Sequence, residues 1–368
     1  MTEVATSRIC AVALRRSLQR DPQGHEAQSH RALVRRIARL IGADYANDPA
    51  DDCAQGAECY FVPDCTLLRE EADALGIRGE ADLFGGVVPY AFVATKTISH
   101  GLIDAAATAP EGWSHALGEA LGDTVLPGYS VFAREDLLRA GGRLLGDGPV
   151  RIKAAHEAGG NGQRVVATER ELADHAATLT DAKLRRYGAV VERDLAAATT
   201  YSIGQVRIGG HEIAYFGTQR QTVDHRGLEV YGGSDLTVVR GRFDDLLACM
   251  LAEEMLRAIE QVLRYDAAVM RAYPDVCATR RNYDVVAGLD RDGRRRSGVL
   301  EQSWRIGGAS AAEIAAIEAL LAEPSRALVR ASTYETYSGE VPGGAEIHFR
   351  GREGQVGSLV KYSLVHPQ

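Results

Sequence analysis

The sequence predicts an α/β protein, and three patterns along its 368 residues support this prediction. The first part of the chain alternates short apolar runs with helical periodicity, which is typical of a small parallel sheet with helices packed on it. The centre combines short strands with a glycine-rich loop. The last part contains alternating apolar runs joined by polar or glycine turns, which indicate antiparallel hairpins.

The N-terminal part is expected to form the parallel layer. Strands are predicted at Ile9–Leu14, Tyr60–Val62 and Gly85–Val93, because these runs are short and apolar. A helix is predicted over residues 28–41, where apolar residues recur at helical spacing, and another over Leu67–Leu75.

The centre of the chain holds the densest set of signals. Residues 101–128 are expected to be helical up to a Leu-Pro-Gly turn, which indicates a boundary. The elements predicted after it are a strand at Val150–Lys153, a glycine loop at residues 159–162, a return strand at Arg164–Val166, a helix at Glu169–Thr178 with Thr168 as its N-cap, and a strand at Gly188–Glu192.

The last part is predicted to alternate hairpins with helices. The predicted elements are a hairpin of Tyr201–Ile208 and Glu212–Gly217, a mobile loop at Tyr231–Asp235, a helix at Asp245–Leu263, a hairpin of Tyr283–Ala287 and Val299–Trp304 around the turn Asp290–Gly293, a helix at Ala311–Leu321, and strands from Ala327 onward.

Charge and composition exclude several classes of protein. The 42 basic and 50 acidic residues leave a net charge of −8, which argues against nucleic acid as the main partner. No apolar run approaches the ~18 residues that a membrane helix needs, so no membrane partner is expected. The six cysteines are too scattered for a disulfide scaffold. We therefore expect a cytoplasmic protein.

A first group of candidate residues combines a lysine with a glycine loop. Lys153 ends a predicted strand, and Gly159, Gly160, Asn161 and Gly162 follow it. Backbone N–H groups of such a loop can close over a polyphosphate, and the ammonium group supplies positive charge. The pattern matches neither a P-loop nor a dinucleotide fingerprint. A glycine-rich turn beside a surface lysine is the alternative interpretation.

A second group is acidic and lies on the late hairpin. Asp284 is on its first strand and Glu301 on its second, and alternation places Val299, Glu301, Ser303 and Arg305 on one face. Two carboxylates on paired strands can share Mg²⁺ together with nucleotide phosphates. The alternative is an ordinary surface ion pair between Glu301 and Arg305.

The order of these motifs resembles the ATP-grasp superfamily. The matching residues are Lys96, Lys153 with the glycine loop 159–162, the hinge Glu192-Arg193-Asp194-Leu195, Asp284, and Glu301-Gln302-Ser303. The resemblance spans about Lys96 to Ala309. It implies ATP contacts from Lys96, Lys153, Gly159, Gly160, Asn161, Gly162, Glu192, Arg193 and Leu195, and Mg²⁺ ligands from Asp284, Glu301 and Ser303.

The resemblance also implies how the chain is divided. An N-terminal Rossmann-like α/β layer would cover residues 1–95, a small lid with the glycine loop residues 96–196, and an antiparallel metal-binding part residues 197–368. Two positions depart from the family pattern. Ser303 stands where the family usually has a metal-binding Asn, and the ribose position after the hinge holds Thr199 or Thr200 rather than an acid.

The activity implied is that of an ATP- and Mg²⁺-dependent ligase. A small-molecule carboxylate would become an acyl phosphate, and an amine would displace the phosphate. Arg305, and Arg281 near the hairpin entrance, would stabilise the developing negative charge. An ATP-binding protein without turnover remains the alternative. Oligomeric state is open, a homodimer being the commonest form.

Overall fold

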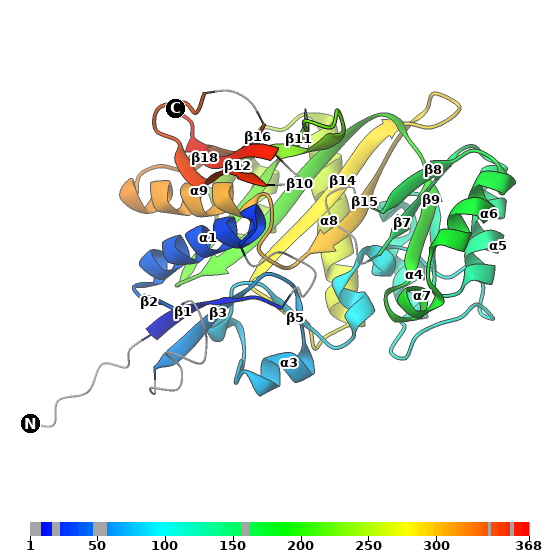
Figure 1. The fold of residues 1–368 in the computed structure, drawn as a ribbon, viewed down its shortest axis with the longest axis horizontal. Coiled ribbons are helices and arrows are strands. Elements are labelled where there is room, and N and C mark those ends of the chain that lie inside the picture. The colour runs from blue at the N-terminus through cyan, green and yellow to red at the C-terminus, as the bar shows by residue number, and fades with distance from the viewer. Residues whose placement is uncertain are drawn as a thin grey trace, which may run out of the picture.

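The computed structural model describes residues 9–16, 23–46, 57–155, 162–337, 340–353 and 357–367. Within these ranges the strands form a three-stranded parallel sheet, an eight-stranded sheet, a small three-stranded sheet and a four-stranded sheet (Figure 1). The α/β class predicted from the sequence is confirmed. Three residues of the predicted glycine loop, Gly159, Gly160 and Asn161, lie outside the described residues.

The N-terminal sheet is parallel, as predicted. Its strands β1 (Ile9–Leu14), β2 (Asp44–Ala46) and β3 (Glu58–Pro63) lie in the order β2-β1-β3. Helix α1 (His25–Ile41) buries Leu33 and Ile37 on its apolar side. This layer therefore follows directly from local periodicity.

The segment after this sheet is less regular than predicted. Strand β5 (Gly86–Val88) stops before Pro89, which removes a backbone donor, and one 3₁₀ turn, Ala91–Ala94, begins within the rest of the predicted strand. The helical segments within residues 101–128 are one short α-helix and one 3₁₀ turn. The elements here are β4 (Leu67–Leu68), α3 (Arg69–Ala74), η2 (Glu80–Asp82), η3 (Ala91–Ala94), η4 (Lys96–Ser99), α4 (His115–Leu121) and η5 (Gly122–Thr124).

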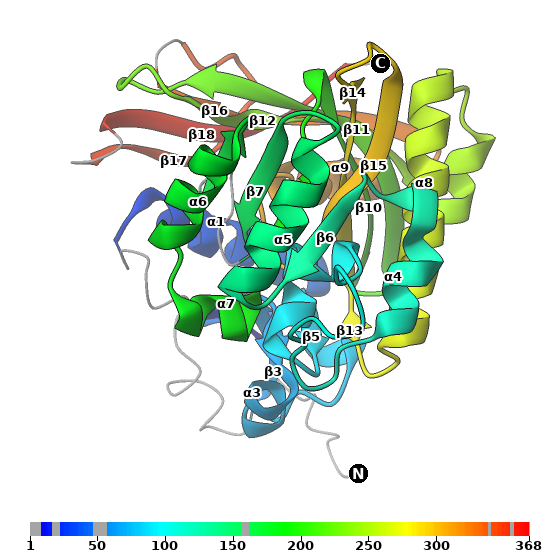
Figure 2. The same ribbon diagram turned by 90° about the vertical axis from the view of Figure 1, so that its right-hand side faces the viewer.

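The four-stranded sheet occupies the centre of the chain and faces the viewer in Figure 2. Its order is β6-β9-β7-β8 and its pairs are antiparallel. Thr168 caps the next helix by accepting the Glu171 N–H, as predicted. The elements are β6 (Gly128–Val131), α5 (Arg134–Leu145), β7 (Val150–Ala154), β8 (Gln163–Val166), α6 (Glu169–Thr178), α7 (Asp181–Tyr187) and β9 (Ala189–Arg193).

The eight-stranded sheet has the order β15-β14-β10-β11-β12-β16-β18-β17. Both predicted hairpins are present in it. Its strands and their helices are β10 (Ala196–Ile208), β11 (His211–Val223), β12 (Glu229–Arg240), η6 (Phe243–Ala248), α8 (Glu253–Ala272), β13 (Cys277–Ala278, paired with β5), β14 (Arg280–Leu289), β15 (Arg295–Ser303), α9 (Ser310–Ala322), β16 (Leu328–Thr336), β17 (Glu346–Glu353) and β18 (Gly357–Val365).

Two expectations in this region are wrong. Residues Tyr231–Asp235 belong to strand β12 and are not a loop. Their glycines allow a close crossing, because a Cβ on Gly233 would stand 2.0 Å from the Thr333 carbonyl oxygen. The helix predicted from Asp245 begins only at Glu253, and the 3₁₀ segment η6 precedes it.

The two faces of the large sheet pack against different helices (Figure 1). One face meets α1 and α9 through a core that includes Val206, Tyr215 and Ile317. The opposite face meets α8 through a core that includes Tyr283 and Val285. Because strand residues alternate, the face of each residue on β14 decides which of these environments it enters.

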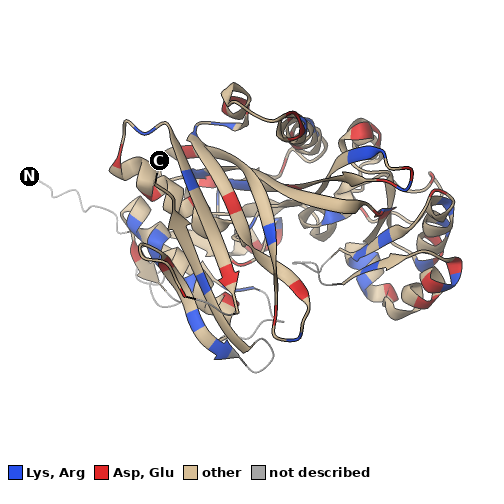
Figure 3. Cartoon of the chain, turned by 90° about the horizontal axis from the view of Figure 1, so that it is seen from above, with Lys and Arg blue, Asp and Glu red and all other residues tan. Residues whose placement is uncertain are grey.

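No helix in the described part of the chain combines the length and the apolar character needed to cross a bilayer. Basic and acidic residues are interspersed along the chain, with neither kind confined to one part of it (Figure 3). The charge distribution therefore agrees with the mixed composition of the sequence.

Candidate active site

A cavity of about 1160 Å³ opens on the α1/α9 face of the eight-stranded sheet and extends to the four-stranded sheet. Its wall brings together residues that are far apart in sequence. The predicted site residues on this wall are Lys153, Glu192, Arg193, Leu195, Asp284, Glu301, Ser303 and Arg305. The ends of the N-terminal strands also reach it through Arg15 and Asp64.

Asp284 and Glu301 stand directly opposite each other on β14 and β15. A β-bulge follows this pair, so that Val285 pairs with Val299 and Leu300 is the additional residue. The bulge overturns one prediction. Val299 packs in the α8 core and does not share the face of Glu301, whereas Leu300 lines the cavity.

Three polar side chains position Asp284. The Asn282 amide and the Ser202 hydroxyl donate to its Oδ1 at 3.0 and 3.3 Å, and the Gln219 amide donates to the Ser202 hydroxyl at 2.9 Å. Burial and the neighbouring Glu301 raise the pKa of Asp284. A cation shared by the two carboxylates would relieve this repulsion.

Lys96 reaches Glu301 from the 3₁₀ turn η4, and its Nζ lies 3.0 Å from Oε2. Burial alone would raise the pKa of Glu301, but Lys96, with Lys153 and Arg305, lowers it overall. The neighbouring Gln302 holds the turn in place by donating to the Val93 and Thr95 carbonyls at 2.8 and 2.7 Å. The strand that carries Glu301 therefore also positions its lysine.

Arg305 lies on the cavity wall just beyond β15 and donates to the Ile306 carbonyl at 2.9 Å. The backbone beneath it is held by the buried pair of Arg280 and Glu313, whose two hydrogen bonds measure 2.8 and 2.6 Å. Arg280 also donates to the carbonyls of Ser303 and Arg305. A charged pair on β14 and α9 thus supports the end of β15, the strand that carries Glu301.

The structure does not bring Arg281 to the site. Arg281 follows Arg280 on β14 and therefore points to the opposite face. Its guanidinium donates to both carboxylate oxygens of Asp266 on α8, at 3.0 and 2.8 Å, and lies over the Phe243 ring. Arg281 thus stabilises the contact between the sheet and α8.

Lys153 and the hinge residue Glu192 form a second, fully buried pair. The Nζ of Lys153 lies 2.5 Å from Oε1, and the Nε2 of His100 lies 3.2 Å from Oε2. Burial would raise the pKa of Glu192, but Lys153 and His100 outweigh it and lower the pKa to about 2. Glu192 is therefore ionised and satisfied on both oxygens.

The rest of the hinge contributes backbone and an apolar surface. Arg193 pairs with Asp147 at 2.7 Å, and Asp194 pairs with Arg151 at 2.7 Å. Leu195 packs with Leu126, Val286 and Leu300 in a small apolar cluster on the cavity wall. This cluster joins the predicted hinge to β14 and β15, which carry Asp284 and Glu301. Such a surface fits the faces of a planar base.

The described end of the glycine loop is held against β7. The Ala154 N–H donates to the Gly162 carbonyl at 3.0 Å, and Gly162 has a φ of 66°, where glycine is favoured. This contact holds Gly162 against the end of β7.

The donor set suits magnesium rather than a metal held by protein alone. Among the residues that the structure describes, no group of three or more His, Cys, Asp or Glu side chains could hold a metal. Mg²⁺ commonly takes one or two carboxylates and completes its shell with phosphate oxygens and water. Asp284 and Glu301 fit that pattern, with the Ser303 hydroxyl on the same wall.

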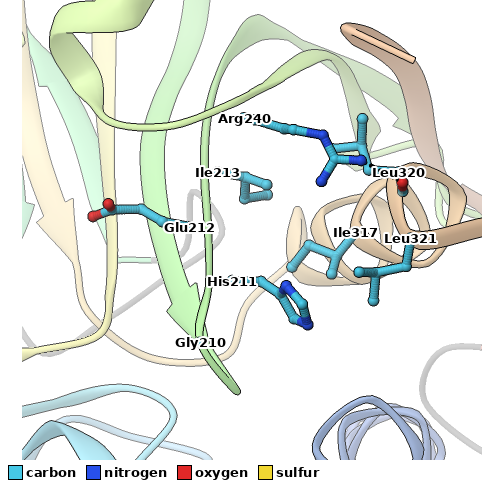
Figure 4. Close-up of a pocket in the computed structure, with 8 residues that line it drawn as sticks. All are labelled: Gly210, His211, Glu212, Ile213, Arg240, Ile317, Leu320 and Leu321. Carbon is cyan, nitrogen blue, oxygen red and sulfur yellow. Dashed lines mark hydrogen bonds between the residues drawn. The ribbon is translucent and has the colours of Figure 1, made fainter. Parts of the chain in front are cut away.

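A smaller hollow of about 170 Å³ lies between β11 and α9 (Figure 4). It is lined by Gly210, His211, Glu212, Ile213, Arg240, Ile317, Leu320 and Leu321. The predicted site residues all lie elsewhere.

A family model described as "Protein of unknown function (DUF3182)" matches residues 13–363. The chain belongs to this family. A search of curated proteins found no match. Among solved structures, the DUF3182 chain is similar to biotin carboxylase from Campylobacter jejuni, with a TM-score of 0.57 and 13% identity over 98% of this chain and 87% of the other.

A second similar structure is phosphoribosylamine–glycine ligase from Thermotoga maritima. Its TM-score is 0.52, with 16% identity over 98% of this chain and 91% of the other. N5-carboxyaminoimidazole synthetase from Staphylococcus aureus has a TM-score of 0.52, with 10% identity over 99% and 94%. These are ATP-grasp proteins. The DUF3182 chain therefore has the ATP-grasp fold, which confirms the resemblance found in its sequence.

Several residues of the DUF3182 site were missed by sequence reasoning. Asn282 and Ser202 could have been found from strand alternation once the pairing of β10 with β14 is known, because both share the face of Asp284. The apolar cluster of Leu126, Val286 and Leu300 has no local signature. It exists only because two sheets meet at the hinge.

Proposed function

We propose that this protein is an ATP- and Mg²⁺-dependent ligase that joins a small-molecule carboxylate to an amine. The observation that supports this most strongly is the pairing of Asp284 with Glu301 on one cavity wall, with Lys153 on the same wall and Lys96 bound to Glu301. Opposite charges arranged in this way can hold the two ends of a magnesium triphosphate.

In this proposal the nucleotide lies between the two sheets. The base occupies the apolar cluster beside Leu195, the ribose lies near Thr199 and Thr200, which line the cavity, and Lys153 faces the phosphates. The part of the chain over residues 96–196 serves as the lid. The solved structures named above include complexes of other proteins with β-γ-ATP and with ADP, which is consistent with a nucleotide in this fold.

The proposed reaction has two steps, a phosphoryl transfer to the carboxylate and then displacement of phosphate by the amine. A carboxylate oxygen of the substrate forms a bond to the γ-phosphorus while the bond to the β-phosphate oxygen breaks, which releases ADP. The amine nitrogen then forms a C–N bond, the acyl C–O bond breaks, and phosphate leaves. The ammonium proton goes to solvent. When bound, Mg²⁺ would neutralise the developing phosphate charge.

Within the protein, each group has a defined part in this scheme. Asp284 and Glu301 would hold the metal, with Ser303 available as a further oxygen ligand. Arg305 is a permanent cation next to them and would stabilise the oxyanion at the reacting carbonyl. Gln302 keeps Lys96 in reach of Glu301 through the two carbonyls that it binds.

The test is ADP formation by the purified protein with Mg²⁺, ATP and pairs of small acids and amines. We expect ADP release that depends on the acid, stops with EDTA, and is lost in Glu301→Gln. ATP binding without ADP from any pair would favour a binding protein instead. ADP release that needs the acid but no amine, with a stable phosphorylated product, would indicate a phosphotransferase.

A further inference from the structure

The N-terminal parallel sheet contributes a second group of polar side chains to the cavity. Strands β1 and β3 end side by side, and Asp64, the residue after β3, lines the wall. The first turns of α1 face the same space through Ser29 and His30. Ligands commonly bind at the carboxyl ends of parallel strands, yet the nucleotide proposal uses none of these residues.

The orientation of His30 is set by a backbone carbonyl. The ring is 5% exposed, and its Nε2 lies 2.8 Å from the Val62 oxygen. A carbonyl can only accept, so Nε2 must carry the hydrogen. In the neutral ring Nδ1 is then an acceptor with a lone pair.

That acceptor has no partner among the residues that the structure describes, and neither does the adjacent Ser29 hydroxyl. A buried polar atom without a hydrogen bond destabilises the folded protein. Burial lowers the pKa of His30, although the nearby Asp64 opposes this shift. The ring is thus a neutral acceptor near pH 7.

Asp64 brings negative charge to this acceptor, and Arg15, which follows β1, is a basic residue on the same cavity wall. Asp64 is largely buried and takes the Arg16 N–H on its Oδ1 at 2.9 Å. The next residue, Cys65, links this corner to the reaction centre. Burial raises the pKa of its thiol to about 12, although the guanidinium group of Arg305 opposes this shift. Ser29, His30 and Asp64 line the same cavity as Arg305.

We propose that His30, Ser29 and Asp64 form the subsite for the amine substrate. The amine nitrogen donates a hydrogen bond to His30 Nδ1, and Asp64 attracts its positive charge before the proton is lost. His30 is a positioning residue that aims the nitrogen toward the acyl phosphate beside Arg305. This inference rests on the proposed ligase function and adds the place and chemistry of its second substrate.

Two substitutions separate this role from a structural one. In His30→Gln the amide reaches the position of Nε2, which keeps the bond to Val62 and removes the acceptor. In His30→Asn the amide stands near Nδ1, which keeps the acceptor and removes the bond to Val62. A structural role for the ring makes Asn the worse substitution, whereas the amine subsite makes Gln the worse one.

The kinetic measurement is the KM for glycine, β-alanine, ethanolamine and putrescine in the ADP assay, with an acid that supports turnover. We expect His30→Gln to raise the KM of the accepted amine by about tenfold or more, in keeping with the loss of one buried hydrogen bond. His30→Asn should stay within about threefold, and the Kd for ATP should not change in either variant. Equal effects of the two variants, or a larger effect of Asn, would overturn the proposal.

A binding measurement keeps the subsite testable even if no acid supports turnover. In the full chain with ¹⁵N-labelled histidine, the Nδ1 resonance of His30, assigned with the His30→Gln variant, should be unprotonated and should shift in a saturable way with at least one of the four amines. No saturable shift with any of them would overturn the amine subsite. A shift without ADP formation would retain the subsite and contradict the ligase function alone.

Discussion

Two lysine–carboxylate pairs lie on opposite sides of the proposed nucleotide site, and they differ in one respect. Lys153 and Lys96 are equally buried, each with about 4% of its side chain exposed. The carboxylates that pair with the two lysines differ in exposure. The side chain of Glu192 is 2% exposed, whereas that of Glu301 is 31% exposed and opens on the cavity.

This difference separates a fixed pair from one that can exchange partners. Glu192 binds two cationic or donor groups at once, Lys153 and His100, and its charge is fully compensated. Glu301 binds Lys96 on one side and faces Asp284 on the other. A cation that enters the cavity can join Glu301 and Asp284, and Lys96 can then turn to a phosphate oxygen. In the proposed function, the first pair fixes the position of Lys153 on the cavity wall, and the second pair contributes the carboxylate that would bind the metal.

The largest expected effect is on activity when Glu301 is changed to Gln. Loss of one of two metal carboxylates removes several kcal/mol of transition-state stabilisation, so kcat for ADP formation should fall by about a thousandfold. Glu335→Gln is the matched control, because Glu335 lines the same cavity but pairs with Lys361 at the far end of the sheet. Comparable losses in both variants would contradict a specific role for Glu301.

Glu192→Gln should act on stability instead. The pKa of Glu192, about 2, is below its ordinary value of 4.5. The charged pair therefore stabilises the fold above pH 4.5, and this stabilisation is lost as the pH falls from 4.5 toward 2. At pH 7 the variant should be less stable by about 3 kcal/mol.

Urea unfolding at pH 7 and at pH 3 measures this effect. The difference between wild type and Glu192→Gln should narrow at pH 3, because the Glu192 carboxyl group of the unfolded chain is protonated there while that of the folded protein stays largely ionised. A stability difference that stays constant between the two pH values would show that the charge of Glu192 contributes nothing.

Arg305→Lys should reduce kcat by about thirtyfold with little change in the Kd for ATP, since lysine cannot make the two-pronged contact of a guanidinium. Arg281→Lys serves as the control on the other face of the same sheet. It should lower the melting temperature through the lost Asp266 contact and leave kcat unchanged. If Arg281→Lys lowered kcat and Arg305→Lys did not, the placement of the oxyanion site would be wrong.

Val286→Ala should have the smallest effect. It removes two methyl groups from the proposed base site beside Leu195, and about 1 kcal/mol of lost contact corresponds to a rise in the KM for ATP of about threefold to tenfold. Val165→Ala, an exposed valine on the lid strand β8, is the control. Measured KM values for ATP that are equal in the two variants would argue against a base in this cluster.

The sequence predicted the elements whose signal is local. Strand β1, the cap of α6 by Thr168 and both hairpins follow from periodicity and turn chemistry over a few residues. The prediction from sequence was wrong where two neighbouring strands, β12 and β16, approach each other closely. Gly232 and Gly233 were predicted to lie in a loop, but they lie within β12, where the Thr333 backbone and the Arg220 side chain leave no room for a side chain on Gly233.

By itself, the sequence determined which chemical groups the site contains. The order of two lysines, a hinge glutamate and two late carboxylates was enough to indicate the ATP-grasp fold. Tertiary structure alone decided which partner each group has. The bulge at Leu300 turns Val299 away from Glu301, and strand alternation sends Arg281 to α8 while Arg280 and Arg305 remain on the cavity side. The physical reason is that the face of a strand residue depends on register and pairing, which arise between segments far apart in the chain.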